Sequence, residues 1–95
     1  VRAAMHTDGT YITVSDDEII HAIVELGSMG IFAEPAGAAA YAGLVKGTSL
    51  GAVGSDDPVL VMNTGSGLKD VRAALRAVPS APVIEPTLEA VKKIL

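Results

Sequence analysis

Residues 59–70 read VLVMNTGSGLKD, an apolar run that passes through small polar residues into an expected helix. The continuous apolar residues Val59–Met62 are typical of a strand buried on both faces. Glycines between such a strand and a helix free backbone N–H groups for a ligand, and open α/β sheets bind ligands at the carboxyl ends of their strands. A single Gly-x-Gly also occurs in plain turns. The spacing alone therefore leaves a binding corner and a tight turn equally open.

Two helices are predicted upstream of this corner. Ser15 followed by Glu18 forms a capping-box pattern, and apolar residues then recur at helical spacing, so we expect a helix over residues 16–27. Pro35 suits the first position of a second helix, over residues 35–46, which consists almost entirely of small residues. Such a helix favours close approach of its backbone to a neighbouring segment.

The remaining segments complete an α/β pattern. Residues 11–14 predict a second strand, while the periodic apolar residues of segment 68–78 and those after Pro86 predict two more helices. The expected fold class is therefore α/β, with a few-stranded sheet flanked by about four helices. Because a two-stranded sheet is marginal alone, we expect either a sheet shared with further chain or a third strand near Ile31 or Val83.

Composition and charge argue against several classes of function. The net charge of −4 and the scattered basic residues argue against a nucleic-acid partner. No apolar run reaches the ~20 residues of a membrane helix and the start is no signal peptide, so we expect no membrane partner and a cytoplasmic location. Cysteine is absent and the two histidines, His6 and His21, are far apart, which argues against thiol catalysis, a catalytic triad and a metal site.

Most of the carboxylates have a local structural explanation. The acidic residues 16–18 suit the positive end of a helix, and Asp56 and Asp57 suit a solvated loop. Glu34 is different, because it precedes Pro35 at the start of an alanine-rich helix, where packed backbone would lie close to its carboxylate. A role as a helix cap and a role in a binding site both remain open for Glu34.

The sequence resembles the C-terminal part of threonine synthase, a family of pyridoxal-phosphate enzymes of the tryptophan-synthase-β type. Three motifs carry the resemblance, in the order and spacing of the family: YITVSDDEI (11–19), GIFAEPAGAAAYAGLVKG (30–47) and VLVMNTGSGLKD (59–70). The resemblance implies that residues 1–95 are the C-terminal segment of the pyridoxal-phosphate-binding domain. The whole domain would then be a larger three-layer α/β cofactor domain.

The same resemblance assigns three cofactor-binding residues. Thr64 matches the hydroxyl that hydrogen-bonds the pyridine nitrogen of pyridoxal 5'-phosphate, and Gly65 matches a residue that lets the backbone approach the ring. Glu34 matches an acidic residue near the cofactor pocket. No catalytic residue and no metal ligand is assigned within this chain.

Two residues of this corner, Ser66 and Lys69, need to be compared individually with the family's motifs. The family commonly has His where Ser66 stands, which leaves room for relatives such as cysteate synthase or a serine/threonine dehydratase. Lys69 resembles the cofactor lysine of the family's TGSFKD segment, but an extra residue separates it from Ser66 and the segment follows EPAGA. We therefore expect Lys69 to be a solvated residue rather than the lysine that binds the cofactor covalently.

The resemblance implies an enzyme that converts O-phosphohomoserine and water to threonine and phosphate, with a small amino-acid substrate. The chain starts at Val1 without Met and lacks the family's cofactor lysine and main phosphate-binding loop, so we expect it to need the rest of a parent chain and to be inactive alone. Cut free, it is expected to self-associate. A stand-alone, non-catalytic small-molecule-binding module and a purely structural domain are the other hypotheses, and the small number of strands argues against the first of these.

Overall fold

The structure is a computed structural model that describes all residues 1–95. It contains five α-helices and one short 3₁₀ turn, joined by segments without regular structure. In chain order the elements are α1 (Arg2–Thr7), α2 (Asp16–Ser28), α3 (Pro35–Ser49), η1 (Gly67–Lys69), α4 (Val71–Ala77) and α5 (Leu88–Lys92). None of these helices combines the length and the hydropathy that a membrane crossing requires.

The predicted α/β fold is wrong, because the chain forms no β-sheet. The two expected strands, residues 11–14 and 59–62, are unpaired, and the only β-type pairing is one antiparallel bridge between Ala33 and Ser66. A strand persists where a neighbouring strand takes up its N–H and C=O groups and where side chains cover its faces. In this chain no strand pairs with residues 59–62 and no element buries their side chains, and Leu60 is 88% exposed.

Helix α2 forms as its capping signal predicts. The N–H of Glu18 donates to Ser15 Oγ at 3.2 Å, and the N–H of Ser15 donates to Glu18 Oε2 at 2.6 Å. Each side chain thus satisfies a backbone donor that the first turn of a helix leaves free. The buried face of α2 consists of Ala22, Ile23 and Leu26, and these residues form the largest part of the core.

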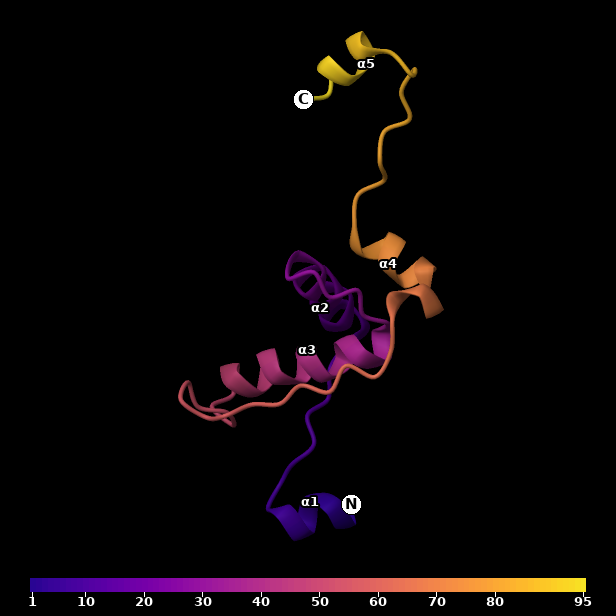
Figure 1. Cartoon of the computed structure of the whole chain (residues 1–95). Coiled ribbons are helices and arrows are strands. Elements are labelled where there is room, and N and C mark those ends of the chain that lie inside the picture. Colours follow the sequence, from indigo (N-terminus) through magenta and orange to yellow (C-terminus); the bar gives the residue numbers. More distant parts are fainter.

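Helix α3 lies across α2 and buries small residues against it (Figure 1). Ala38 and Ala42 are 0% and 4% exposed, so the two helix backbones approach closely at these positions. The helix runs to Ser49, three residues beyond its predicted end, and the chain turns at Gly51, whose φ of 71° lies in the left-handed region that glycine tolerates.

The segment after α3 runs back along this helix toward the start of it (Figure 1). Near the end of this return, a side chain at Gly37 would overlap the Asn63 amide. The absence of a side chain at Gly37 therefore lets the end of the return segment lie against the backbone of α3. The return segment places residues 63–67 at the N-terminus of α3.

The helix predicted over residues 68–78 is divided into η1 and α4. Asp70 separates the two elements and caps α4, since its Oδ1 accepts the N–H of Ala73 at 3.0 Å. The buried side of α4 is Ala73, which packs on α2, while the apolar residues that predicted the helix point outward. Their exposed fractions are 75% for Leu68, 48% for Val71, 68% for Leu75 and 51% for Val78.

The ends of the chain lie away from the packed helices. Figure 1 shows α1 at one extreme and α5 at the other, with α2, α3 and α4 between them. The molecule measures 62 × 27 × 19 Å and has a radius of gyration of 17.7 Å, against about 12 Å for a compact domain of this length. Its accessible surface is 7407 Å², whereas a compact monomer of this mass would have about 5,100 Å². Much apolar surface is therefore uncovered.

Candidate cofactor site

Two loops meet at the N-terminus of α3. We define the loop pair as residues 31–35 together with residues 63–67. The N–H of Glu34 donates to the Gly65 carbonyl oxygen at 3.0 Å, and the N–H of Gly67 donates to the Phe32 carbonyl oxygen at 2.9 Å. These bonds flank the Ala33–Ser66 bridge and leave Ala33 only 1% exposed. The EPAGA and NTGSG motifs are thus joined through their backbones.

Glycines allow the two loops to meet this closely. A methyl group at Gly65 would overlap the Glu34 carboxylate, and one at Gly67 would overlap the Phe32 ring. Neither glycine has a positive φ. Glycine is needed at both positions because of the space that the facing side chain occupies, and not because of backbone conformation.

The side chain of Glu34 does not cap α3, although its position would allow it to do so. Glu34 is the N-cap residue of α3, yet its side chain makes no capping hydrogen bond. The carboxylate lies instead against Gly65, with its side chain 17% exposed, and Oε1 is 3.6 Å from Lys69 Nζ. Of the two roles open from sequence, the structure excludes the cap, and it leaves an acidic group in the loop pair.

All three residues that the sequence assigned to cofactor binding lie in the loop pair. Thr64 is exposed and its hydroxyl has no hydrogen-bonding partner within the chain, while Gly65 is half-buried against Glu34. The structure therefore brings Glu34, Thr64 and Gly65 together. Their contact with a cofactor stays a prediction.

Sequence reasoning missed two side-chain contacts at the loop pair, those of Lys69 and Asn63. Lys69 is 64% exposed, in keeping with a solvated lysine, but it is also the ion-pair partner of Glu34. Asn63 lies against Gly37 at the start of α3. Both contacts join residues far apart in the chain, and no local pattern marks such pairs.

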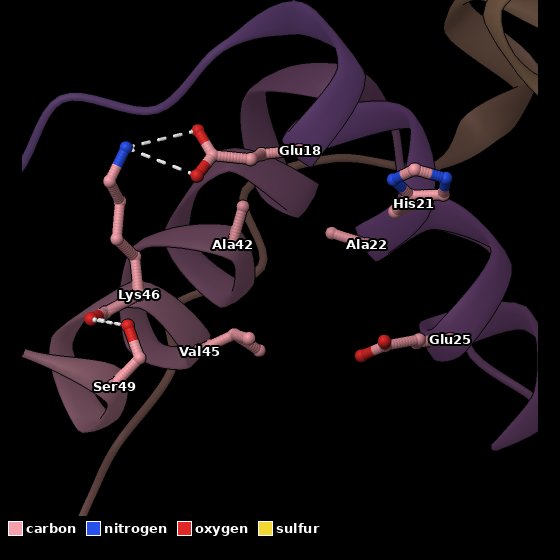
Figure 2. A pocket seen from close by; sticks show the side chains of 8 residues that line it. All are labelled: Glu18, His21, Ala22, Glu25, Ala42, Val45, Lys46 and Ser49. Atoms are coloured by element: carbon pink, nitrogen blue, oxygen red, sulfur yellow. Dashed lines mark hydrogen bonds and ion pairs between the residues drawn. The ribbon is translucent and has the colours of Figure 1, made fainter.

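A separate open groove lies between α2 and α3 and has a volume of about 320 Å³ (Figure 2). An ion pair between Lys46 Nζ and Glu18 Oε1, 3.0 Å long, closes one side of it. The Ser15 N–H, and then Lys46, hold the pKa of Glu18 below its usual 4.5. The lining residues are Glu18, His21, Ala22, Glu25, Ala42, Val45, Lys46 and Ser49.

Beside this groove, Glu25 of α2 affects Tyr41 of α3. Hydrogen bonding to the Glu25 carboxylate, followed by burial, raises the pKa of the Tyr41 phenol above its usual 10.0. His21 lies on the exposed side of α2 and lines the groove, as a helix-surface histidine. The groove contains none of the residues assigned to the cofactor.

Comparison with known proteins identifies the class to which this arrangement belongs. Residues 1–65 match the family described as pyridoxal-phosphate dependent enzyme. The match covers more than half of the chain and includes Glu34, Thr64 and Gly65. The chain belongs to the pyridoxal-phosphate dependent enzyme family, and the cofactor class implied by the motifs is confirmed for that family.

Individual relatives indicate a narrower group within this family. The chain is 39% identical over 94 residues to the threonine synthase of Methanocaldococcus jannaschii, an alignment that covers 97% of this chain and 23% of that protein. It is 38% identical over 96 residues to the threonine synthase of Mycobacterium tuberculosis, with 99% of this chain and 27% of the relative covered. The resemblance to threonine synthases is therefore confirmed, and the chain spans about a quarter of the length of these relatives.

The side chains of the loop pair are chemically compatible with the pyridine end of pyridoxal phosphate. A hydroxyl such as that of Thr64 can hydrogen-bond a ring nitrogen without carrying a charge, and it is exposed at the surface of the loop. The neighbouring carboxylate of Glu34 already has Lys69 as a counter-charge. The site thus presents a neutral hydroxyl beside the ion pair of Glu34 and Lys69.

Proposed function

We propose that this chain is the C-terminal segment of the cofactor-binding domain of a pyridoxal-phosphate-dependent threonine synthase. The parent reaction converts O-phosphohomoserine and water to threonine and phosphate, so the substrate is a small phosphorylated amino acid. The observation that carries the proposal is the hydrogen-bonded loop pair, which joins Glu34 to the loop of Thr64 and Gly65. The threonine synthases to which the chain is similar support the choice of reaction.

In this proposal the chain supplies the pyridine side of the cofactor pocket. The Thr64 hydroxyl hydrogen-bonds the pyridine nitrogen, and the backbone at Gly65 lies close to the ring. Because a hydroxyl does not hold that nitrogen protonated, the cofactor, when bound, supplies a moderate electron sink, and surrounding groups direct the reaction. Glu34 lies next to this loop as half of an ion pair with Lys69.

The rest of a parent chain is the partner that the proposal requires. The accessible surface exceeds that of a compact monomer of this mass by roughly 2,300 Å². Apolar side chains such as Leu60, Leu68 and Leu75 lie on this surface, with 88%, 75% and 68% of their area exposed. In the whole enzyme, the preceding residues would cover these side chains and supply the lysine that binds the cofactor and the phosphate-binding loop.

The test is to express the full-length enzyme and to supply it with O-phosphohomoserine. We expect threonine and inorganic phosphate to appear in equal amounts, only when pyridoxal phosphate is bound. A cofactor-loaded enzyme that releases no phosphate, and instead produces ammonia from serine or threonine, would be a dehydratase. That result would overturn the proposed reaction while leaving the family assignment intact.

A further inference from the structure

Two charged side chains meet at the open side of Gly65. The three atoms nearest to the position of a missing methyl group are Oε1 and Cδ of Glu34 and Nζ of Lys69. The ion pair therefore occupies the space that a side chain at residue 65 would fill. Glu34 comes from the start of α3 and Lys69 from the end of η1, so this side-chain contact joins the first loop to the turn that directly follows the second loop.

The backbone around Lys69 is fixed to the loop that carries Thr64. Ser66 Oγ accepts the Leu68 N–H at 3.3 Å, and the Ser66 carbonyl oxygen accepts the Lys69 N–H at 3.0 Å. The η1 turn therefore begins directly at the end of the Thr64–Gly65 loop. From this turn, hydrogen-bonded to Ser66, the Lys69 side chain places its Nζ beside Gly65.

Glu34 needs a counter-charge in this place. Its side chain is only 17% exposed, and it accepts no hydrogen bond from the free N–H groups of α3. A half-buried carboxylate that loses its only ion-pair partner moves toward water. That movement would leave a space over Gly65 and would loosen the loop against the start of α3.

From these contacts we propose that Lys69 is a positioning residue for the cofactor. By pairing with Glu34 it holds the carboxylate against Gly65, and so it fixes the orientation of the loop that presents the Thr64 hydroxyl. This role rests on the proposed function, and it gives Lys69 a purpose that does not involve a covalent bond to the cofactor.

The chain offers a matched control, because it contains one other lysine–carboxylate ion pair. Lys46 and Glu18 pair at 3.0 Å between α3 and α2, outside the loop pair, and the lysine is 36% exposed. Lys46→Met and Lys69→Met remove the same charge and keep a side chain of similar length. Lys69→Arg keeps the charge at residue 69.

The experiment uses the full-length apoenzyme, titrated with pyridoxal phosphate, together with hydrogen–deuterium exchange of segments 31–35 and 63–69 and thermal melting. We expect Lys69→Met to weaken cofactor binding about three- to tenfold and to speed exchange in both segments. Lys69→Arg should stay within about twofold of the wild type in both measurements. Lys46→Met should alter cofactor binding by no more than that, even where it lowers the melting temperature as much as Lys69→Met does.

Two outcomes overturn the positioning role. One is unchanged cofactor affinity and exchange in Lys69→Met, and the other is an equal loss of affinity in Lys46→Met. Either outcome leaves the proposed function intact if the wild-type enzyme binds the cofactor and makes threonine. A wild-type enzyme that does not bind pyridoxal phosphate would overturn the proposed function itself, and the positioning role with it.

Discussion

At residue 34 a carboxylate that stands before the first turn of α3 turns away from that helix and lies against Gly65. The carboxylate can lie there because residue 65 is glycine and has no side chain. The φ of Gly65 is not in the left-handed region, so any residue could adopt its backbone conformation. A substitution at this position therefore probes the contact with Glu34 and not backbone strain.

Gly65→Ala is expected to destabilise the full-length enzyme by about 1–3 kcal/mol and to weaken cofactor binding, because the new methyl group displaces the Glu34 carboxylate from its pair with Lys69. Urea unfolding of the apoenzyme and titration with pyridoxal phosphate measure the two effects. Gly43→Ala is the control: a methyl group there meets no atom within 4 Å, and in a helix it should stabilise by about 0.5–1 kcal/mol. Equal effects of the two substitutions would contradict the importance of the contact.

Thr64→Val tests the hydroxyl proposed for the pyridine nitrogen. Valine keeps the shape and removes the hydrogen bond, so we expect the activity of the full-length enzyme to fall by about ten- to a hundredfold, from a loss of roughly 1–3 kcal/mol. Steady-state kinetics and cofactor titration are the measurements. Thr64→Ser retains the hydroxyl and should retain most of the activity. Unchanged turnover and cofactor affinity in Thr64→Val would remove Thr64 from the site.

At the scale of elements, α2 and α3 are linked by a residue with two functions. Glu18 closes the capping box of α2 and also pairs with Lys46 of α3. The Ser15 N–H, followed by Lys46, keeps the pKa of Glu18 below 4.5, so its ionised form is favoured in the folded chain. The stabilisation from this group is complete above the unfolded pKa and is lost as the pH falls through the lower, folded value.

The lowered pKa of Glu18 in the folded chain predicts how stability depends on pH. The melting temperature of the wild-type enzyme should fall below about pH 4.5 more steeply than that of Glu18→Gln, because the amide has no ionised form to lose. Parallel curves for wild type and Glu18→Gln would show that Glu18 makes no such contribution.

Elements determined by neighbouring residues could be predicted from the sequence, and those that need distant partners could not. The start of α2 follows from Ser15 and Glu18, which lie three positions apart and satisfy each other. The apolar residues 59–62 have strand propensity, but propensity records packing on a sheet that this chain does not form. The same division applies to the site. The motifs of Glu34, Thr64 and Gly65 were found through resemblance, whereas the Glu34–Lys69 pair came only from the structure.

At the scale of the whole molecule, the small core explains the extended shape. Seven residues, five of them alanines, form the core, while residues 78–87 carry α5 away from it without packing on α2 or α3 (Figure 1). The surface that remains includes the outward apolar side of α4. Exposed apolar area of this extent is typical of a surface that another protein segment covers.

The isolated 95-residue chain is therefore expected to self-associate, or to be marginally stable as a monomer. Sedimentation equilibrium over a wide concentration range, with thermal melts at the same concentrations, tests this expectation. We expect the apparent mass to rise with concentration. A monomer that melts cooperatively above about 65 °C at every concentration would be complete by itself and would contradict a dependence on further chain.

The bridge between Ala33 and Ser66 has a consequence for the order of folding. It joins residues 33 positions apart and encloses α3 and its return segment in one closed ring of chain. Closing a flexible ring of that length costs about 3 kcal/mol of chain entropy, whereas α2 and α3 meet across a connection of a few residues. The two helices should therefore pair early, and the ring should close late and open first. The loop of Thr64 would then take its final shape only after the rest of the core has formed.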